Sequence, residues 1–439
     1  MVKDVVSVKY KEHDVGAASF NTETGIGSFE FEPRFIKTGI ELSPIKMPLS
    51  PKIYSFPEAD PAAFNGLPGM LADSLPDDFG NAVLNAWIAS QGKLPADITP
   101  IQRLRYTGKR GMGALTYHPA TQIKNLNVSQ HIEIQSLVSI AQEILDKRER
   151  FRIDLGAQGE EDKEAMMELL SVGVSAGGAR PKAILAFNDD FTQVRSGQTD
   201  VPEGFTHFIM KFDGVSEHNK DKETFGDPMG YGTMEYVYHL MAKECGIEMM
   251  PCRLLDEGNR RHFITQRFDR DGNEKRHVQT LNGLAHVSYK KAGLYSYAEL
   301  FTIARELKLS SDDAMQIFKR MVFNIVARNH DDHSKNFGFM LDDQYHWQLT
   351  PAYDLVYSYK PKSYWVGSHW MKLNGKRDNF TREDFYSLGK LSSLFSKHKI
   401  DQIIDETTEH VSKWNGLAAE NCVPHSLIEL IGSNLRLTI

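Results

Sequence analysis

Cysteine is scarce in this chain, in which 439 residues include only three, Cys245, Cys252 and Cys422. No two of them stand in a Cys-x-x-Cys spacing, which argues against a disulfide framework and against a structural zinc site. A low cysteine content also fits a reducing compartment. We therefore expect a cytoplasmic protein.

Long apolar runs and an excess of basic charge are missing as well. The opening residues MVKDVVSVKYKEHD lack the apolar core of a secretory signal. No run approaches the ~20 apolar residues that cross a bilayer. The 51 Lys and Arg residues are outnumbered by 58 Asp and Glu residues, which gives a net charge of −7. The sequence thus predicts no membrane association and no strong nucleic-acid binding by the chain alone.

The first 147 residues are expected to form a small mixed α/β domain with a linking helix. Alternating apolar segments predict short strands, at 5–10, 16–21 and 27–32. A helix is expected over 81–90, and a glycine-rich turn leads into a strand within 108–119. Ser129 is the expected cap of the linking helix, which would continue to residue 147.

Two further parts are expected, over residues 148–272 and 273–439. The first would combine strands with one long helix, after a short helix at 165–173. The second would be mostly helical. The expected strands lie at 183–187, directly after a glycine loop, and at 206–214 and 261–272. The expected helices lie at 232–249, 296–307, 310–329 and 381–395. This order predicts an α+β fold with a cleft between the last two parts.

A polar loop with the sequence NHDDHSKNFGF occupies residues 329–339. It follows a predicted amphipathic helix and leads into a β-hairpin predicted over 337–350. A hairpin folds the chain back on itself. Asp354, just beyond it, should therefore lie beside Asp331 and Asn336.

These three residues suit phosphoryl transfer. Asp331 and Asn336 have the Asp-x-x-x-x-Asn spacing of a kinase catalytic loop, and Asp354 supplies a later acid. Such a site needs a carboxylate to orient the attacking hydroxyl and Mg²⁺ to neutralise phosphate charge. Mg²⁺ takes a few carboxylate or amide oxygens as ligands. Two other interpretations stay open: a solvated turn, and a metal-dependent phosphohydrolase whose ligands are His330, Asp331 and His333.

Upstream, the segment SAGGARPK at 175–182 joins glycines to Arg180 and Lys182. Glycines let backbone N–H groups approach phosphate oxygens. The segment is neither a Walker A loop nor the usual kinase glycine motif, and an ordinary turn is the alternative. Lys211 lies in an apolar strand, where a kinase pairs such a lysine with a helix glutamate, here Glu235. Alternatively, Lys211 reaches water at a strand end and Glu235 is a surface residue.

The strand candidate at 261–272 would supply the adenine contacts, through backbone groups around Gln266 and Phe268. The alternative for its charged residues is a surface ion-pair cluster, made by Arg267, Asp269 and Arg270. Taken together, a glycine loop, a lysine, a helix glutamate, a hinge, a catalytic loop and a metal-binding acid follow one another in the protein-kinase order.

These residues resemble the HipA family of serine/threonine kinase toxins from bacterial toxin–antitoxin systems, over nearly the whole chain. The first part carries LPGMLADSLPDDFGN and TGKRGMGALTY, and the rest carries SAGGARPKA, HFIMKFDG, QRFDR, DDHSKNFGF and TPAYDL. The resemblance implies a HipA-type N-terminal domain over 1–147. A two-lobed protein-kinase-like core would follow, with its lobes over 148–272 and 273–439.

The resemblance also implies ATP and Mg²⁺ as cofactors and a role for each motif residue. Asp331 would be the catalytic base, and Asn336 and Asp354 would bind Mg²⁺. Ser175 would be autophosphorylated, which opposes nucleotide phosphates with negative charge and silences the enzyme. The residues that would bind the nucleotide are Gly177, Gly178, Ala179, Arg180, Lys182, Lys211, Gln266, Arg267, Phe268, His333, Lys335 and Tyr353.

The sequence departs from the common family form at two places. The catalytic loop reads Asp331-Asp332-His333, where the common form has glycine second. The extra carboxylate of Asp332 either adds a metal contact or faces water. In the glycine loop, Arg180-Pro181 stands where some relatives carry Gln-Glu, and the proline would stiffen the loop.

We therefore expect ATP-dependent phosphorylation of a protein serine or threonine. Family likeness points to a target in translation, such as an aminoacyl-tRNA synthetase. It also implies a helix-turn-helix antitoxin of the HipB type as partner, with DNA contacted only indirectly through that antitoxin. Three alternatives stay open: a small-molecule kinase of the same core fold, the phosphohydrolase, and an inactive corepressor module.

Overall fold

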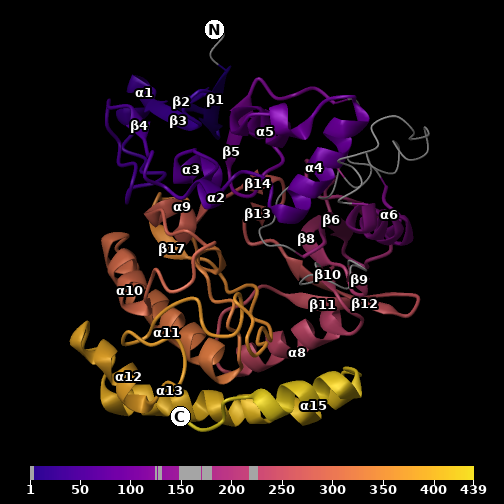
Figure 1. Ribbon diagram of the computed structural model, residues 1–439, viewed down its shortest axis with the longest axis vertical. Helices are drawn as coiled ribbons and strands as arrows, with labels where there is room; N and C mark the ends of the chain where they lie inside the picture. The colour runs from indigo at the N-terminus through magenta and orange to yellow at the C-terminus, as the bar shows by residue number, and fades with distance from the viewer. Residues whose placement is uncertain (1–3, 124–125, 127–130, 148–169, 171–179, 217–225) are drawn as a thin grey trace. The chain divides into compact units, whose positions relative to one another are not determined.

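The computed structural model describes residues 4–123, 126, 131–147, 170, 180–216 and 226–439. It divides into two compact units, each built from segments that are distant in the sequence (Figure 1). The first comprises Met1–Leu42, Met47–Gly232 and Arg253–Val278, and the second comprises Ser43–Lys46, Thr233–Cys252 and Gln279–Ile439. The domain boundaries expected near residues 147 and 272 stay predictions.

The first unit contains a five-stranded antiparallel sheet in the order β4-β3-β2-β1-β5. Its strands are β1 (Asp4–Tyr10), β2 (His13–Asn21), β3 (Ile26–Phe31), β4 (Tyr54–Ser55) and β5 (Leu115–His118). In β1 the alternate residues Val6, Val8 and Tyr10 are buried, as expected for a strand with one face on a core. The strands that the sequence predicts in this part are confirmed.

Among the described residues of the first unit, most helices are short and two, α4 (Asp78–Ser90) and α6 (Ile134–Lys147), are longer. The short ones are α1 (Pro33–Ile36), α2 (Pro61–Phe64), α3 (Gly69–Ala72), α5 (Pro100–Thr107) and the 3₁₀ turn η1 (Pro95–Asp97). The helix predicted over 81–90 is confirmed as α4 (Asp78–Ser90). Asp77 caps it by accepting a hydrogen bond from the Gly80 amide at 2.6 Å.

The linking helix α6 (Ile134–Lys147) begins later than the sequence predicts. His131 forms an isolated β-bridge with Arg195, and the Ile132 amide donates to the Val194 carbonyl at 3.0 Å. These contacts keep residues 131–132 extended, so the expected helix is wrong there. Its expected cap, Ser129, and the short helix expected at 165–173, apart from residue 170, lie outside the described residues.

A second sheet of the first unit has the order β11-β12-β8-β6-β7. Its strands are β6 (Lys182–Asn188), β7 (Val194–Ser196), β8 (Phe205–Lys211), β11 (Cys252–Glu257) and β12 (Arg260–Gln266). The central strand β8 pairs antiparallel with β6 and β12, which sets Lys211 opposite Lys182 and Phe263. The first unit also contains short strands of two residues each, β9 (Val215–Ser216), β10 (Gly226–Asp227), β13 (Arg270–Asp271) and β14 (Glu274–Lys275).

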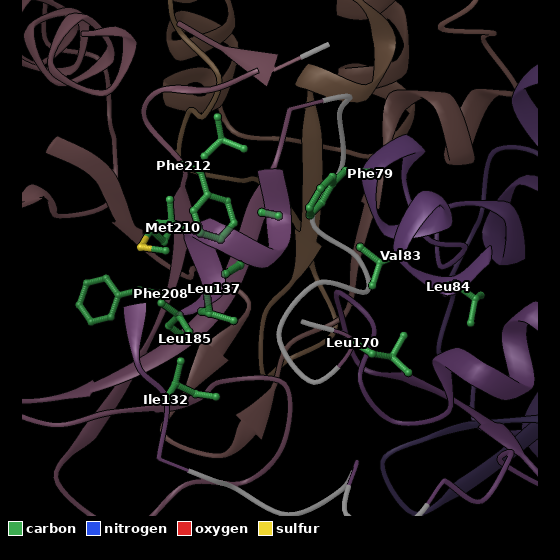
Figure 2. Close-up of a cluster of buried hydrophobic side chains, with 14 of the residues drawn as sticks. Phe79, Val83, Leu84, Ile132, Leu137, Leu170, Leu185, Phe208, Met210 and Phe212 are labelled. Carbon is green, nitrogen blue, oxygen red and sulfur yellow. The ribbon is translucent and has the colours of Figure 1, made fainter. Parts of the chain in front are cut away.

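One apolar core joins this sheet to helices α4 and α6 (Figure 2). Phe79 and Val83 of α4 belong to the same buried cluster as Leu185 of β6 and Met210 of β8. Six consecutive residues of β6 are buried, as in a strand covered on both faces. Since burial of each large apolar side chain contributes about 1.5–3 kcal/mol, this cluster holds the N-terminal helices to the second sheet.

The second unit is mostly helical, as the sequence predicts. Its helices are α8 (Tyr231–Glu244, whose first two residues belong to the first unit), α9 (Leu281–Ala285), α10 (Tyr297–Glu306), α11 (Ser311–Val326), α12 (Arg382–Tyr386), α13 (Lys397–Ser412), α14 (Trp414–Glu420) and α15 (His425–Asn434). Two 3₁₀ turns are η3 (Ser334–Asn336) and η4 (Ser387–Lys390). The capping box predicted between Thr381 and Asp384 is confirmed.

The hairpin predicted over 337–350 is also confirmed. It consists of β16 (Gly338–Leu341) and β17 (Trp347–Leu349), with Phe339 opposite Leu349. Together with β15 (Val278–Thr280) these strands form a three-stranded sheet. Within the ranges that the structure describes, no helix has the length and apolar character needed to span a membrane.

Candidate active site

The predicted catalytic loop begins where α11 ends. A capping box between Ser310 and Asp313 starts this helix, and its buried face fixes where its last turn lies. Arg328 then adopts a left-handed conformation with a φ of 57°, which turns the chain out of the helix. Asn329 donates from Nδ2 to Asn324 Oδ1 at 2.9 Å. The first loop residue is therefore tied back to the helix.

The hairpin brings Asp354 to this loop. The Tyr353 hydroxyl donates to the Lys335 carbonyl at 2.7 Å, and Asn329 Nδ2 donates to the Asp354 carbonyl at 3.2 Å. Gly338 allows the close approach, because a Cβ there would lie 3.1 Å from the Tyr353 hydroxyl and 2.9 Å from Thr350 Oγ1. The prediction that Asp354 lies beside the loop is confirmed.

The donor set of the loop fits a hard cation. Asn336 donates from Nδ2 to the Asp331 carbonyl at 2.8 Å, which leaves the amide oxygen of Asn336 as its ligand atom. Asp354 adds a carboxylate from the hairpin side. An amide oxygen and a carboxylate are ligands that Mg²⁺ uses when phosphate and water complete its shell. The roles of Asn336 and Asp354 in binding Mg²⁺ remain predictions.

Asp331 itself is accessible from solvent. Its side chain is 43% exposed, and its Oδ1 lies 3.7 Å from Nε2 of His333. The ring of His333 packs edge-on against Tyr289, with centroids 5.8 Å apart, and Lys335 Nζ lies 4.3 Å from the Tyr289 ring centroid. A carboxylate that solvent can reach can accept a proton from a substrate hydroxyl.

Asp332 neither faces water nor stands in a cluster of metal-ligand residues. Its side chain is fully buried, and it accepts four hydrogen bonds, from the Tyr297 hydroxyl, His369 Nδ1 and the amides of Trp370 and Met371. Across the described part of the chain, no group of three or more His, Cys, Asp or Glu residues is arranged to hold a metal ion. The expectation that Asp332 faces water is therefore wrong, and its four hydrogen bonds occupy the positions that a metal contact would need.

His330 is packed as a buried aromatic residue. Its ring centroid lies 4.1 Å from that of His369 and 4.8 Å from that of Tyr359. Burial, with the charges of His369 and Arg328, lowers the pKa of His330 far below its ordinary value. The histidine ligand set that a phosphohydrolase would need is not assembled by the described residues.

The expected phosphate-binding lysines lie in the first unit, at neighbouring ends of β6 and β8. Both are buried, with 5% of Lys182 and 6% of Lys211 exposed, and they stand directly opposite each other. Like charges in this position repel unless they are neutralised. Lys182 Nζ lies 3.3 Å from Asp77, the cap of α4. Lys182 is thus held by a carboxylate of its own unit.

Arg267, Asp269 and Arg270 of the predicted hinge form an ion-pair cluster, which was the alternative to adenine contacts. The cluster lies in the protein interior and not on the surface, where it was expected. Arg267 donates to both oxygens of Asp269 at 2.8 and 2.7 Å, and Arg270 adds a contact of 2.6 Å. The Arg267 and Asp269 side chains are fully buried, so a surface cluster is wrong. Burial alone would raise the pKa of Asp269, but the two arginines lower it below its usual value.

The glycine-rich turn before β5 supplies the rest of this cluster. The Gly113 amide donates to Asp269 Oδ2 at 2.9 Å, and the Gly111 carbonyl accepts from Arg270 at 3.0 Å. Gly113 has a φ of +71°, and a Cβ there would lie 3.1 Å from the Val278 amide nitrogen. Both motifs are visible in the sequence, but no local pattern indicates that they meet.

The other expected nucleotide residues are placed only in part. Gln266 and Phe268 are half-buried, one on each side of the buried Arg267. Arg180 is half-buried just before β6. Ser175, Gly177, Gly178 and Ala179 lie outside the described residues. Glu235 is buried in α8, so a surface position for it is wrong. Its pairing with Lys211, which belongs to the other unit, stays a prediction.

Comparison with known proteins identifies relatives over both parts of the chain. Residues 174–414 match the family model of the HipA-like C-terminal domain, and residues 6–118 match that of the HipA N-terminal domain. A putative kinase from Haemophilus influenzae is 23% identical over 227 residues, which is 45% of this chain and 66% of that protein. A putative kinase from Sinorhizobium fredii is 25% identical over 126 residues, 26% of this chain and 30% of that protein. The chain thus aligns with less than two thirds of either relative.

A solved structure resembles the whole fold. A chain from the complex of HipA, HipB and operator DNA of the Shewanella oneidensis MR-1 toxin–antitoxin system matches with a TM-score of 0.64 at 17% identity. The match covers 98% of this chain and 95% of that one, and it confirms the predicted α+β architecture with a kinase-like core. The HipA-like C-terminal model spans more than half of the chain and follows a HipA N-terminal domain. This protein therefore belongs to the HipA family.

Proposed function

We propose that this protein is an ATP- and Mg²⁺-dependent serine/threonine-protein kinase, the toxin of a HipA-type toxin–antitoxin system in the cytoplasm. The observation that supports the proposal is that hydrogen bonds tie Asn336 to the Asp331 carbonyl and the segment of Asp354 to the same loop of the second unit. The two relatives described as putative kinases support the same activity. An aminoacyl-tRNA synthetase is the protein target that family likeness favours.

In this proposal Asp331 accepts the proton of the acceptor hydroxyl. The hydroxyl oxygen forms a bond to the γ-phosphorus of ATP, the bond from that phosphorus to the β–γ bridging oxygen breaks, and ADP leaves with the electron pair. Asn336 and Asp354 would hold Mg²⁺, which neutralises phosphate charge when bound. Lys335, beside the loop, and Lys211, from the first unit, would bind phosphate oxygens. Gln266 and Phe268 would line the adenine site, which suits their half-buried positions at the end of β12.

The partner in this proposal is a helix-turn-helix antitoxin of the HipB type. The similar Shewanella chain comes from a complex with HipB and operator DNA. The net charge of −7 argues against strong DNA binding by this chain alone. DNA would therefore be reached through the antitoxin.

The test is transfer of the labelled γ-phosphate of ATP to protein. Purified wild-type protein should label itself and a protein in lysate when Mg²⁺ is present. Asp331→Gln should lower both rates by about 10²–10⁴-fold, the range of a general base. Ser175→Ala should abolish labelling of the chain itself but retain labelling of the lysate protein. The matched control is Asp342→Gln, in the hairpin turn.

Three results would contradict the proposal. No labelled protein, with a labelled small molecule instead, would favour a small-molecule kinase. Release of phosphate that survives Lys211→Ala and requires a transition metal would favour a hydrolase. A wild-type protein that binds the antitoxin and transfers no phosphate would favour an inactive corepressor.

A further inference from the structure

Two adjacent carboxylates in the catalytic loop lie in opposite environments. The side chain of Asp331 is 43% exposed, whereas that of Asp332 is not exposed at all. A buried carboxylate is costly unless donors satisfy it. The Asp332 carboxylate therefore needs hydrogen-bond donors inside the protein, whereas the Asp331 carboxylate is accessible from solvent.

All acceptor positions of Asp332 are used. Oδ1 accepts from the Trp370 amide at 2.7 Å and the Met371 amide at 3.4 Å. Oδ2 accepts from the Tyr297 hydroxyl at 2.7 Å and from His369 Nδ1 at 3.0 Å. An ionised carboxylate offers about four such positions. The donors come from α10 and from residues 369–371, so Asp332 joins the loop to two segments that are distant in the sequence.

The same network continues to the other side of the site. The Tyr297 hydroxyl accepts from Asn324 Nδ2 at 3.4 Å, and Asn324 Oδ1 accepts from Asn329 Nδ2 at 2.9 Å. Asn329 Nδ2 also donates to the Asp354 carbonyl at 3.2 Å. Tyr297, Asn324, Asn329 and Asp332 are each at most 2% exposed. One continuous buried network thus runs from the neighbour of Asp331 to the backbone of Asp354.

The backbone at Asp354 needs such support. Its φ is +54°, in the left-handed region that residues other than glycine seldom adopt, although aspartate does so more often than most. The hydrogen bond from Asn329 satisfies the carbonyl of this residue. Burial, with the nearby charge of Asp332, raises the pKa of Tyr297 well above its ordinary value, so its hydroxyl stays protonated and donates.

We propose that Asp332, Tyr297, Asn324 and Asn329 form a positioning network that fixes Asp331 and Asp354 relative to each other for phosphoryl transfer. This inference rests on the proposed kinase function. None of the four residues touches the reacting atoms. Their contribution is to hold a general base and a metal-binding acid in one geometry, where a misplacement of about 1 Å can cost about 10²-fold in rate.

The test compares two tyrosine hydroxyls in the full-length protein. Tyr297→Phe removes one hydroxyl from the network and keeps the ring, which packs edge-on against Phe337 at 6.0 Å. The matched control is Tyr386→Phe, because the Tyr386 hydroxyl also donates to a carboxylate, Asp401, at 2.7 Å in the same unit. Autophosphorylation rates are measured as a function of ATP and Mg²⁺ concentration, below the thermal unfolding transition of each variant.

We expect Tyr297→Phe to lower kcat about tenfold and Asp332→Asn to lower it about 100-fold, within the range for mispositioned groups. The KM for ATP should stay within about twofold, and half-saturation by Mg²⁺ should shift upward. The double variant should be no slower than Asp332→Asn, because the two changes break one network. Tyr386→Phe should leave kcat unchanged.

Folded Tyr297→Phe and Asp332→Asn variants with wild-type kcat would overturn the inference. Equal losses in Tyr297→Phe and Tyr386→Phe would also overturn it, because they would indicate general destabilisation. Should Asp332→Asn fail to fold, Tyr297→Phe alone decides between these outcomes. A wild-type protein that transfers no phosphate overturns the proposed function and this inference together, which distinguishes the two failures.

Discussion

Two fully buried aspartates, Asp269 in the first unit and Asp332 in the second, show two ways of keeping a carboxylate inside a protein. Asp269 is neutralised by two guanidinium groups and one backbone amide. Asp332 accepts from a hydroxyl, an imidazole and two backbone amides. The first arrangement is an ion-pair cluster between motifs of one unit. The second satisfies a carboxylate without a guanidinium group, immediately beside the predicted base.

The largest effect should follow removal of the charge of Asp269. Asp269→Asn leaves Arg267 and Arg270 buried without a counter-charge, which costs about 3–5 kcal/mol of unfolding free energy. Denaturant unfolding measures the change. The control is Asp271→Asn, whose carboxylate is 72% exposed and lies 3.2 Å from Arg276. Equal stability of the Asp269→Asn and wild-type proteins would contradict the role of the cluster.

The next effect is a pH dependence at His207, which lies beside the cluster. Burial, aided by the charge of Arg267, lowers the pKa of His207 to about 4. Between its ordinary value of 6.5 and about 4, the unfolded chain binds a proton that the folded chain does not. Stability should therefore fall as pH drops through this window, by up to about 3 kcal/mol.

His207→Gln should flatten the dependence of unfolding free energy on pH between 6.5 and 4. Denaturant titrations at several pH values measure it. The Nδ1 bond of His207 to the Gly197 carbonyl, at 2.9 Å, has a counterpart in the amide of glutamine. An unchanged slope would show that His207 is not a proton-linked group.

A smaller effect is expected for Asp332→Asn on stability. No guanidinium or ammonium group is among its donors, so the change mainly leaves imperfect hydrogen bonds, at about 1–3 kcal/mol. Thermal or denaturant unfolding would measure it alongside Asp269→Asn. A loss as large as that of Asp269→Asn would contradict the comparison, because it would mean that the hydrogen-bonded Asp332 matters as much for stability as the ion-paired Asp269.

The smallest effect should come from an exposed counterpart of the Asp269 cluster. Arg382 contacts Asp401 at 2.7 Å and also Asp405, with a third of its side chain exposed. Exposed pairs contribute about 0.2–1 kcal/mol and are screened by salt. Arg382→Ala should lose no more than that, and the loss should shrink in high salt. A salt-independent loss of several kcal/mol in unfolding free energy would show that solvent exposure does not explain the difference between the Arg382 and Asp269 clusters.

Much of the fold could be predicted from the sequence, because the patterns that specify these helices and strands are local. Period-two alternation predicted β1 to β3, a Ser and Asp start with an apolar face predicted α11, and the turn at 342–344 predicted the hairpin. Helices α13 to α15 were not individually predicted. Helical spacing is nevertheless present in the buried positions of α13, which are Ile400, Ile403, Ile404, Thr407 and Val411. The start of α6 was predicted wrongly, because residues 131 and 132 pair with residues 195 and 194, which are distant in the sequence.

In the candidate site, too, some features follow from local patterns and others depend on distant contacts. Spacing and the hairpin were enough to predict that the segment of Asp354 returns to the loop of Asp331 and Asn336, because each step is a local turn or strand pairing. Lys182 shows the opposite case. No pattern within a short window could indicate that it meets Asp77, about a hundred residues earlier in the chain.

The sequence by itself determined the element order, the HipA-type motifs and the spacing of the predicted catalytic loop, since these depend on neighbouring residues. Only the tertiary structure decided what Asp332 and Asp269 do. The donors to Asp332 come from segments tens of residues away, and Asp269 accepts from the distant Gly113 amide as well as from its neighbours Arg267 and Arg270. Burial and hydrogen-bond partners are properties of packing, and a carboxylate has the same letter in the sequence whether it faces water, a metal ion or a buried tyrosine.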